Sequence, residues 1–376
     1  MPLRRVVPLA VFVFSVVFLF SASARPSKDS RGQEPEDKLP APVPKKVTLP
    51  EKGMPLSEAL RSFSDQTRVP VRTSLDNNPV LKLDMKDVPF WEALDRIAEA
   101  AGARVRIHGE QGTIALVGDV RFDKTLPQYM SRSGIFRVAL QRLSATLDFE
   151  NGTAGYKASL EVAWEPDFLP YFLETRPDNL VMHDAANAPV RLLAPGGTWE
   201  PVEGRKSFNV DLSLPALPRT AGKISLLKGA FAIRGATRLV TFEFDTLDKL
   251  RADEKKRKKT VDGVTVSVGD IKLGDRAWTI QVTTQLPPAS ADFDSHQSWD
   301  TGNQIYLLNR DGRTLLTTRL YTRENPGSRK AVVSYHFVDT PQVKRGDAAD
   351  WRLVYRAPAG IVEVPVPFEF KNVRLP

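Results

Sequence analysis

Residues 81–102 read LKLDMKDVPFWEALDRIAEAAG, and two hydrophobic periods follow one another in this stretch. Leu81, Leu83 and Met85 alternate with charged residues, which is the pattern of a half-buried strand. After Pro89 the apolar residues recur at helical spacing instead. Proline is tolerated in the first turn of a helix, so the stretch predicts a strand followed by a helix that starts after Pro89.

The same pattern occurs 34 residues earlier, in residues 47–68, VTLPEKGMPLSEALRSFSDQTR. Each copy supplies one helix with strands on either side, and one copy alone cannot bury its apolar helix face. The two copies therefore predict one small β/α domain of βαββαβ type over residues 47–120. A helical repeat array is excluded, because such an array needs about three stacked units. The two copies have identical residues at equivalent positions, among them Leu49 and Leu83, Pro55 and Pro89, Glu58 and Glu92, Ala59 and Ala93, and Leu60 and Leu94.

These residues resemble the secretin and TonB short N-terminal (STN) domain, a small β/α module of the bacterial envelope. The resemblance rests on the helix starts PLSEAL and PFWEAL, the strand LKLDMKDV and the closing GTIALV of residues 112–117. It implies a periplasmic protein-interaction module that has no catalytic residues. Too few strands follow Val120 for the membrane barrel of the large receptors, so the resemblance is not extended to transport or secretion.

The N-terminus has the three parts of a secretory signal peptide. Residues 1–24 begin with MPLRR, continue with an apolar run and end in Ala-Ser-Ala. The apolar run is shorter than the ~20 residues of a spanning helix, which favours cleavage after Ala24 over a retained anchor. Residues 25–46 are rich in Pro and charge and predict a disordered tether. The expected product is periplasmic or secreted, without a transmembrane segment after cleavage.

The remaining sequence consists of short alternating segments separated by turn residues, including the hairpin signal Asn151-Gly152. This pattern predicts two immunoglobulin-like β-sandwich domains, over residues 134–248 and 261–376. Residues 249–260 are predicted to be a charged linker between them. The predicted fold class is therefore α+β: a signal peptide and tether, a small β/α domain and two all-β sandwiches.

Composition excludes several functional classes. The chain has no cysteine, so disulfides, thiolate metal sites and a cysteine nucleophile are excluded. The net charge is +8, and the basic run of residues 255–259 has no aromatic neighbour, so nucleic acid is not an expected partner. The serine elbow, the Walker loop and the GxGxxG signature are missing. No cofactor is predicted.

One stretch is dense in metal-binding residue types. Asp292, Asp294 and His296 alternate, so in an extended strand they would share one face and could hold a divalent ion. The favoured interpretation is a polar loop whose acidic residues are solvated. Residues 300–302, Asp-Thr-Gly, match half of an aspartic-protease site, but no second triplet exists to share the proton.

Other motifs also favour structural interpretations. The four histidines are spread over the predicted domains without HxxxH spacing, so no metal site is predicted from them. Residues 345–347, Arg-Gly-Asp, fit ordinary turn chemistry rather than receptor adhesion. Trp199 and Trp299 lie in loop-like sequence and are candidate ligand contacts, as exposed aromatic platforms for a sugar or a protein. Half-buried loop anchors are the favoured interpretation for both.

The sequence thus predicts a non-catalytic interaction or scaffolding protein of the bacterial envelope. The expected partner is another envelope protein, bound at the module or by strand addition at a sheet edge. The alternative is binding of polysaccharide or peptidoglycan through Trp199 or Trp299. A hydrolase is a third hypothesis, for which no catalytic constellation is visible.

Overall fold

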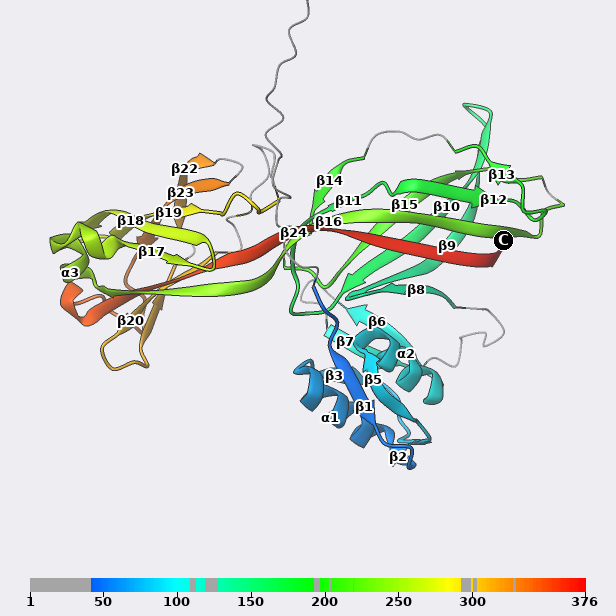
Figure 1. The fold of residues 1–376 in the computed structure, drawn as a ribbon, viewed down its shortest axis with the longest axis horizontal. Coiled ribbons are helices and arrows are strands. Elements are labelled where there is room, and N and C mark those ends of the chain that lie inside the picture. Colours follow the sequence, from blue (N-terminus) through cyan, green and yellow to red (C-terminus); the bar gives the residue numbers. More distant parts are fainter. Residues whose placement is uncertain are drawn as a thin grey trace, which may run out of the picture. The chain divides into compact units, whose positions relative to one another are not determined.

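The computed structural model describes residues 42–108, 113–118, 128–192, 197–202, 204–218, 220–291, 299, 303–318, 320–326 and 329–376. These residues form mostly β-sheet, with few helices (Figure 1). The predicted predominance of strands is confirmed. The predicted signal peptide and all but the last residues of the predicted tether lie outside the described residues.

The β/α module contains two helices, α1 (Leu56–Thr67) and α2 (Phe90–Ala100), which start directly after Pro55 and Pro89. The apolar residues at helical spacing are buried, among them Phe63 and Leu94. The sheets are β1 (Lys46–Leu49) with β5 (Met85–Pro89), β2 (Met54–Pro55) with β4 (Val80–Leu81), and β3 (Val71–Thr73), β7 (Thr113–Val117) and β6 (Arg104–His108) in that order.

The strand expected around Leu81, Leu83 and Met85 is divided between two sheets. Leu81 in β4 pairs with Met54, whereas Met85 in β5 pairs with Leu49. All three alternating residues are buried in the core of the module. The alternation therefore identified the buried face correctly, although the two ends of the segment hydrogen-bond to different strands.

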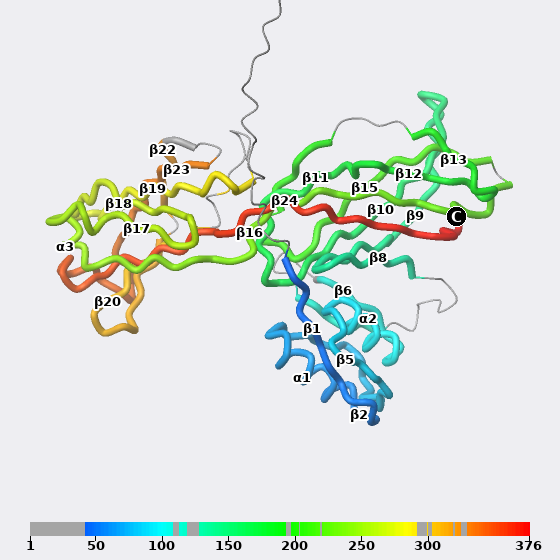
Figure 2. The backbone as a smooth tube through the Cα atoms, viewed as in Figure 1, coloured from blue at the N-terminus to red at the C-terminus, as the bar shows by residue number. Residues whose placement is uncertain are grey.

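Two strands of 24 residues each, β16 (Lys223–Thr246) and β24 (Trp351–Arg374), pair antiparallel with each other. Their register is unbroken from the Lys223–Arg374 pair to the Glu243–Val354 pair. Figure 2 shows the two strands side by side along this length. The strands come from the two separately predicted sandwich regions, which therefore share one sheet.

The half of this strand pair that contains Lys223–Ile233 and Val362–Arg374 packs against a four-stranded sheet. The apolar residues between the two layers include Trp164, Phe231 and Phe368. The four strands are, in order, β15 (Ser207–Pro215), β10 (Thr153–Trp164), β9 (Phe136–Asp148) and β8 (Tyr129–Ser133). The shared sheet is extended here by β12 (Asp178–His183), β13 (Pro189–Val190), β11 (Leu169–Glu174) and β14 (Trp199–Pro201).

The other half packs against a five-stranded sheet, around a core that includes Trp278, Phe337 and Tyr355. The five strands are, in order, β17 (Lys258–Val261), β18 (Val264–Leu273), β19 (Trp278–Gln285), β23 (Lys330–Phe337) and β22 (Tyr321–Pro326). The shared sheet continues here with β20 (Gln304–Asn309) and β21 (Leu315–Thr317), and a 3-10 turn, Ala348–Asp350, precedes β24. Together, the β-sheets outside the module are called the body below.

Residues 249–260, predicted as a charged linker, have regular structure. They contain the end of α3 (Leu247–Ala252), a 3-10 turn at Glu254–Arg257 and the start of β17. Leu250 is buried, and the Lys259 ammonium lies 5.5 Å from the ring centre of Phe244. The alkyl stems of such basic side chains can cover apolar surface while their charges stay in water, so a basic run need not be a loose linker.

Gly360 lies near the middle of the β16–β24 pair and has a positive φ of 63°. A Cβ atom at this position would lie 2.3 Å from Oγ1 of Thr237 on the opposite strand. The strand pair thus contains one point where only glycine fits without strain.

We expect Gly360→Ala to lower the free energy of unfolding by about 1–3 kcal/mol, through backbone strain and the clash with Thr237. Urea denaturation measures this change. Gly222→Ala is the matched control, because a Cβ there meets no atom within 4 Å, and its effect should stay within about 0.5 kcal/mol. Equal effects of the two substitutions would contradict the assignment of strain to Gly360.

Candidate functional site

The module contacts the body through one face of α2. Trp91 and Asp95 are four residues apart and therefore lie on the same side of the helix. The indole Nε1 of Trp91, which is 1% exposed, donates to the carbonyl of Ile135 at 2.9 Å. The Asp95 carboxylate accepts from Nε of Arg132 at 2.7 Å and from Nε of Arg137 at 3.2 Å. Together with Lys45 and Glu165, described below, these residues form the module–body interface.

Arg137 joins the module to a second carboxylate in the body. Its side chain is buried, and its Nη1 lies 3.8 Å from Oε2 of Glu161. Burial raises the pKa of Glu161, and the Arg137 charge and the Ser207 hydroxyl oppose this rise. Buried charges are tolerated only when paired, so Asp95, Arg137 and Glu161 form a compensated row across the interface.

A turn between β10 and β11 closes one end of the interface. Its Glu165 accepts at Oε2 from the backbone N–H of Lys45 at 3.0 Å. The Lys45 ammonium pairs with Asp167 at 2.7 Å and also donates to the Thr67 carbonyl at the end of α1. Burial raises the pKa of Glu165 to about 7, while the hydrogen bond and charge of Lys45 oppose this rise. Oε1 of Glu165 is buried without a hydrogen-bond partner among the described residues.

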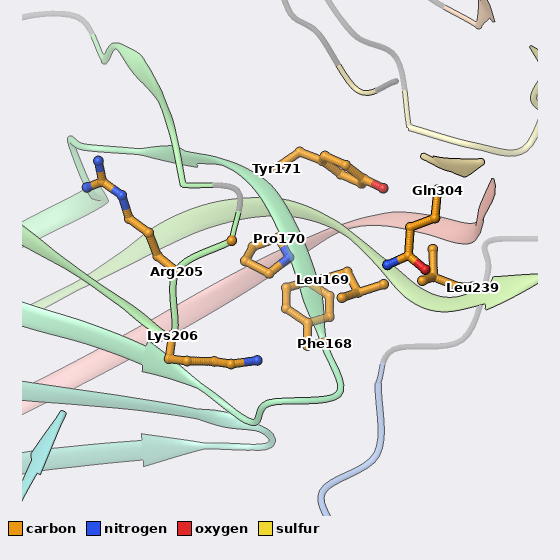
Figure 3. Close-up of a pocket in the computed structure, with 9 residues that line it drawn as sticks. Phe168, Leu169, Pro170, Tyr171, Arg205, Lys206, Leu239 and Gln304 are labelled. Carbon is orange, nitrogen blue, oxygen red and sulfur yellow. The ribbon is translucent and has the colours of Figure 1, made fainter. Parts of the chain in front are cut away.

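The same turn leads into a pocket of about 190 Å³ (Figure 3). Figure 3 shows Gln304 and Leu239 opposite Leu169, with the Arg205 side chain directed away. Lys206 donates to the Pro166 carbonyl at 3.0 Å, and burial lowers the pKa of its amine. The pocket is lined by Phe168, Leu169, Pro170, Tyr171, Gly204, Arg205, Lys206, Leu239 and Gln304.

The pocket is small. Its volume lies below the ~300 Å³ at which ligand pockets usually begin. None of its lining residues is acidic or a histidine, so they supply no carboxylate or imidazole for proton transfer. The Gln304 amide oxygen accepts from Arg356 at 2.9 Å and is thus used within the fold.

The two predicted aromatic platforms are in different environments. Trp299 is 1% exposed and belongs to the core, so it is a buried anchor and not an exposed platform. Trp199 is half-buried in β14, and the guanidinium of Arg234 lies 4.1 Å from its ring centre. Arg234 also pairs with Glu363 at 2.8 Å. One face of the Trp199 ring is therefore covered by an arginine that is itself held in place.

The predicted metal ligands Asp292, Asp294 and His296 lie outside the described residues, as do residues 300–302. Within the described part of the chain, no group of three or more His, Cys, Asp or Glu side chains gathers as a metal site would require. His183 bonds Asn187, and His336 lies between Thr279 and Thr322.

The Arg-Gly-Asp triplet has a structural role at its arginine. Arg345 is 8% exposed and bonds Asp339 at 2.8 Å and the Gly274 carbonyl at 3.1 Å. Its guanidinium lies 5.6 Å from the ring centre of Trp278. A side chain held in this way is not presented to a receptor, in agreement with the expectation of ordinary turn chemistry.

Sequence analysis missed an open sheet edge at β15. This strand of nine residues pairs with β10 without a bulge, and no described strand pairs with its other side. Three other edge strands of the body, β17, β22 and β8, have protective features. Lysines line β17, β22 contains a register shift, and β8 is joined to β24 through the Tyr129 hydroxyl.

No protein-family model, curated protein or solved structure matches this chain. None of the described helices has both the length and the apolar character that crossing a membrane requires. The functional conclusion therefore depends on the geometry described above.

We expect Asp95→Ala to destabilise the protein by about 2–4 kcal/mol, because Arg132 and Arg137 lose their shared carboxylate. Chemical denaturation measures the loss. Glu92→Ala on the same helix is the control. It removes only a partly exposed pair with Arg96, and its effect should stay below about 0.5 kcal/mol. Similar losses of stability in the two variants would contradict a larger contribution from the buried interface contacts of Asp95.

Glu165 should make stability fall as pH rises. Its pKa is about 7 in the folded protein and 4.5 ordinarily, so between these values the folded state binds more protons than the unfolded state. Glu165→Gln should match the wild type near pH 4 and exceed its unfolding free energy by up to roughly 3 kcal/mol above pH 8. Denaturation at several pH values measures this. Glu99 is exposed, so Glu99→Gln should not alter the dependence of the unfolding free energy on pH. If Glu165→Gln and the wild type showed the same pH dependence, the effect assigned to Glu165 would be refuted.

Proposed function

We propose that this chain is a non-catalytic, exported protein of the bacterial envelope that binds other proteins by strand addition at β15. The observation that carries the proposal is the open edge of this strand. A long, regular edge strand is a template for pairing with another chain, and natural proteins usually protect such edges. Export is supported by the signal-peptide features of residues 1–24.

The register identifies the backbone groups that a partner would meet. Residues of an antiparallel strand alternate between those that bond the neighbour and those whose N–H and C=O point away. The Trp164 N–H donates to the Lys206 carbonyl at 3.3 Å. By the alternation of the register, the N–H and C=O groups of the even-numbered residues of β15 therefore bond β10. Pro215, which has no N–H, then falls on the outward side, where none is needed. The outward groups belong to Ser207, Asn209, Asp211 and Ser213.

The side chains of β15 define the chemistry of the partner segment. Val210, Leu212 and Leu214 are buried on the inner face, while Asn209 and Ser213 are exposed on the outer face. An added strand would continue both faces, so it should alternate apolar and polar side chains. We infer an extended segment of an envelope protein as the occupant.

The β/α module supports the envelope assignment. Its two helices, two two-stranded sheets and one three-stranded sheet fit the STN-like domain that the sequence resembles. The layered sheets of the body fit immunoglobulin-like sandwiches joined by a shared strand pair. Modules of this kind serve protein interaction, and the buried contacts of Trp91 and Asp95 would present the module in a defined orientation.

Polysaccharide binding and hydrolysis have less support. Glycan platforms need an accessible aromatic face, whereas Trp299 is buried and Arg234 covers one face of Trp199. Hydrolysis needs paired acid and base groups, and the pocket beside Lys206 has no acidic residue among its lining.

The test is photocrosslinking of the full chain in intact envelopes. The wild type should capture a discrete partner, and Asn209→Pro or Ser213→Pro should reduce capture at least about tenfold, because each removes an outward N–H while keeping the bonds to β10. Asn209→Ala and Ser213→Ala keep the N–H and should retain capture. Circular dichroism checks the fold. An empty wild-type capture, or undiminished capture by both proline variants, would reject strand addition at β15.

A further inference from the structure

Glu165 lies at the point where the chain enters the module. Its Oε2 accepts from the backbone of Lys45, and its own N–H donates to the Ile135 carbonyl at 3.0 Å. The same carbonyl accepts from the Trp91 indole of α2. Glu165 is therefore connected to two segments of the module, to Lys45 through its carboxyl group and to α2 through its backbone N–H and the Ile135 carbonyl.

The charges around Glu165 do not compensate a buried carboxylate. The Lys45 ammonium is paired with Asp167 at 2.7 Å, so two carboxyls face one ammonium there. Lys206, from the segment before β15, directs its amine to the Pro166 carbonyl. Oε1 of Glu165 is buried and has no hydrogen-bond partner among the described residues. An ionised carboxylate at this position would therefore lack the hydrogen bonds that water gives to an exposed carboxylate.

We propose that Glu165 is a proton-controlled latch, which holds the module against the body while its carboxyl is protonated and loosens the module–body interface when the proton is lost. Loosening of the interface would expose the Glu165 carboxyl to water and so favour its ionised form. The direction agrees with the raised pKa of the group. The Asp95–Arg137 pair limits the separation, because both partners must be rehydrated when they part.

Fluorescence energy transfer within the full chain tests the latch without any partner. The protein has no native cysteine, so Asp65→Cys in α1 and Thr146→Cys in β9 can carry a pair of pH-insensitive dyes. Both positions are exposed. We expect one population at pH 5.5 and, at pH 8.5, at least about a threefold rise in a second population of lower transfer efficiency.

Glu165→Gln and Glu165→Met should each keep a single population at both pH values. Glu174→Gln is the matched control, because burial and the charges of Asp178 and Glu363 also raise the pKa of Glu174, but Glu174 lies in β11 and makes none of the contacts described for the module–body interface. It should retain the wild-type response. A wild type without the second population, or a response lost in Glu174→Gln and kept in Glu165→Gln, would overturn the latch. Neither result depends on β15 binding a partner.

Discussion

β16 and β24 pair along nearly their whole length, and both halves of the body use this strand pair. The body therefore cannot be separated into two independent halves. Each half packs a second sheet onto a different part of the same strand pair. The strand pair also positions the strands that extend the shared sheet and the sheets that pack on it, including β10 and β15 over one half. The pairing also restricts which residues fit at single positions, as at Gly360, where a Cβ atom would clash with Thr237 on the opposite strand.

Local features of the sequence predicted local structure well. Prolines at 55 and 89 and the apolar residues behind them identified both helices, because helix starts depend on neighbours within a few positions. The pairing of β16 with β24 joins residues more than a hundred positions apart, and alternation does not specify which strands are neighbours. Two separate sandwich regions were the natural prediction from alternation alone.

The functional residues show the same division. The sequence around Trp299 left both an exposed platform and a buried anchor open, because burial depends on packing that the neighbouring residues do not reveal. No motif marks Glu165, because only the fold brings Lys45 to it. The β15 edge is open among the described strands, and a sequence pattern does not specify which strands are neighbours. In contrast, the structural role expected for the Arg-Gly-Asp triplet agrees with the contacts of Arg345, although its bond to the Gly274 carbonyl joins residues far apart in the sequence.

The shared strand pair also affects the order in which this protein can fold. Residues 351–374 follow every other described strand, yet they complete the sheet in both halves of the body. Neither half can close while these residues are still being synthesised. The sheet shared by the two halves therefore stays incomplete until residues 351–374 have emerged, and the apolar faces that this sheet covers stay exposed for as long.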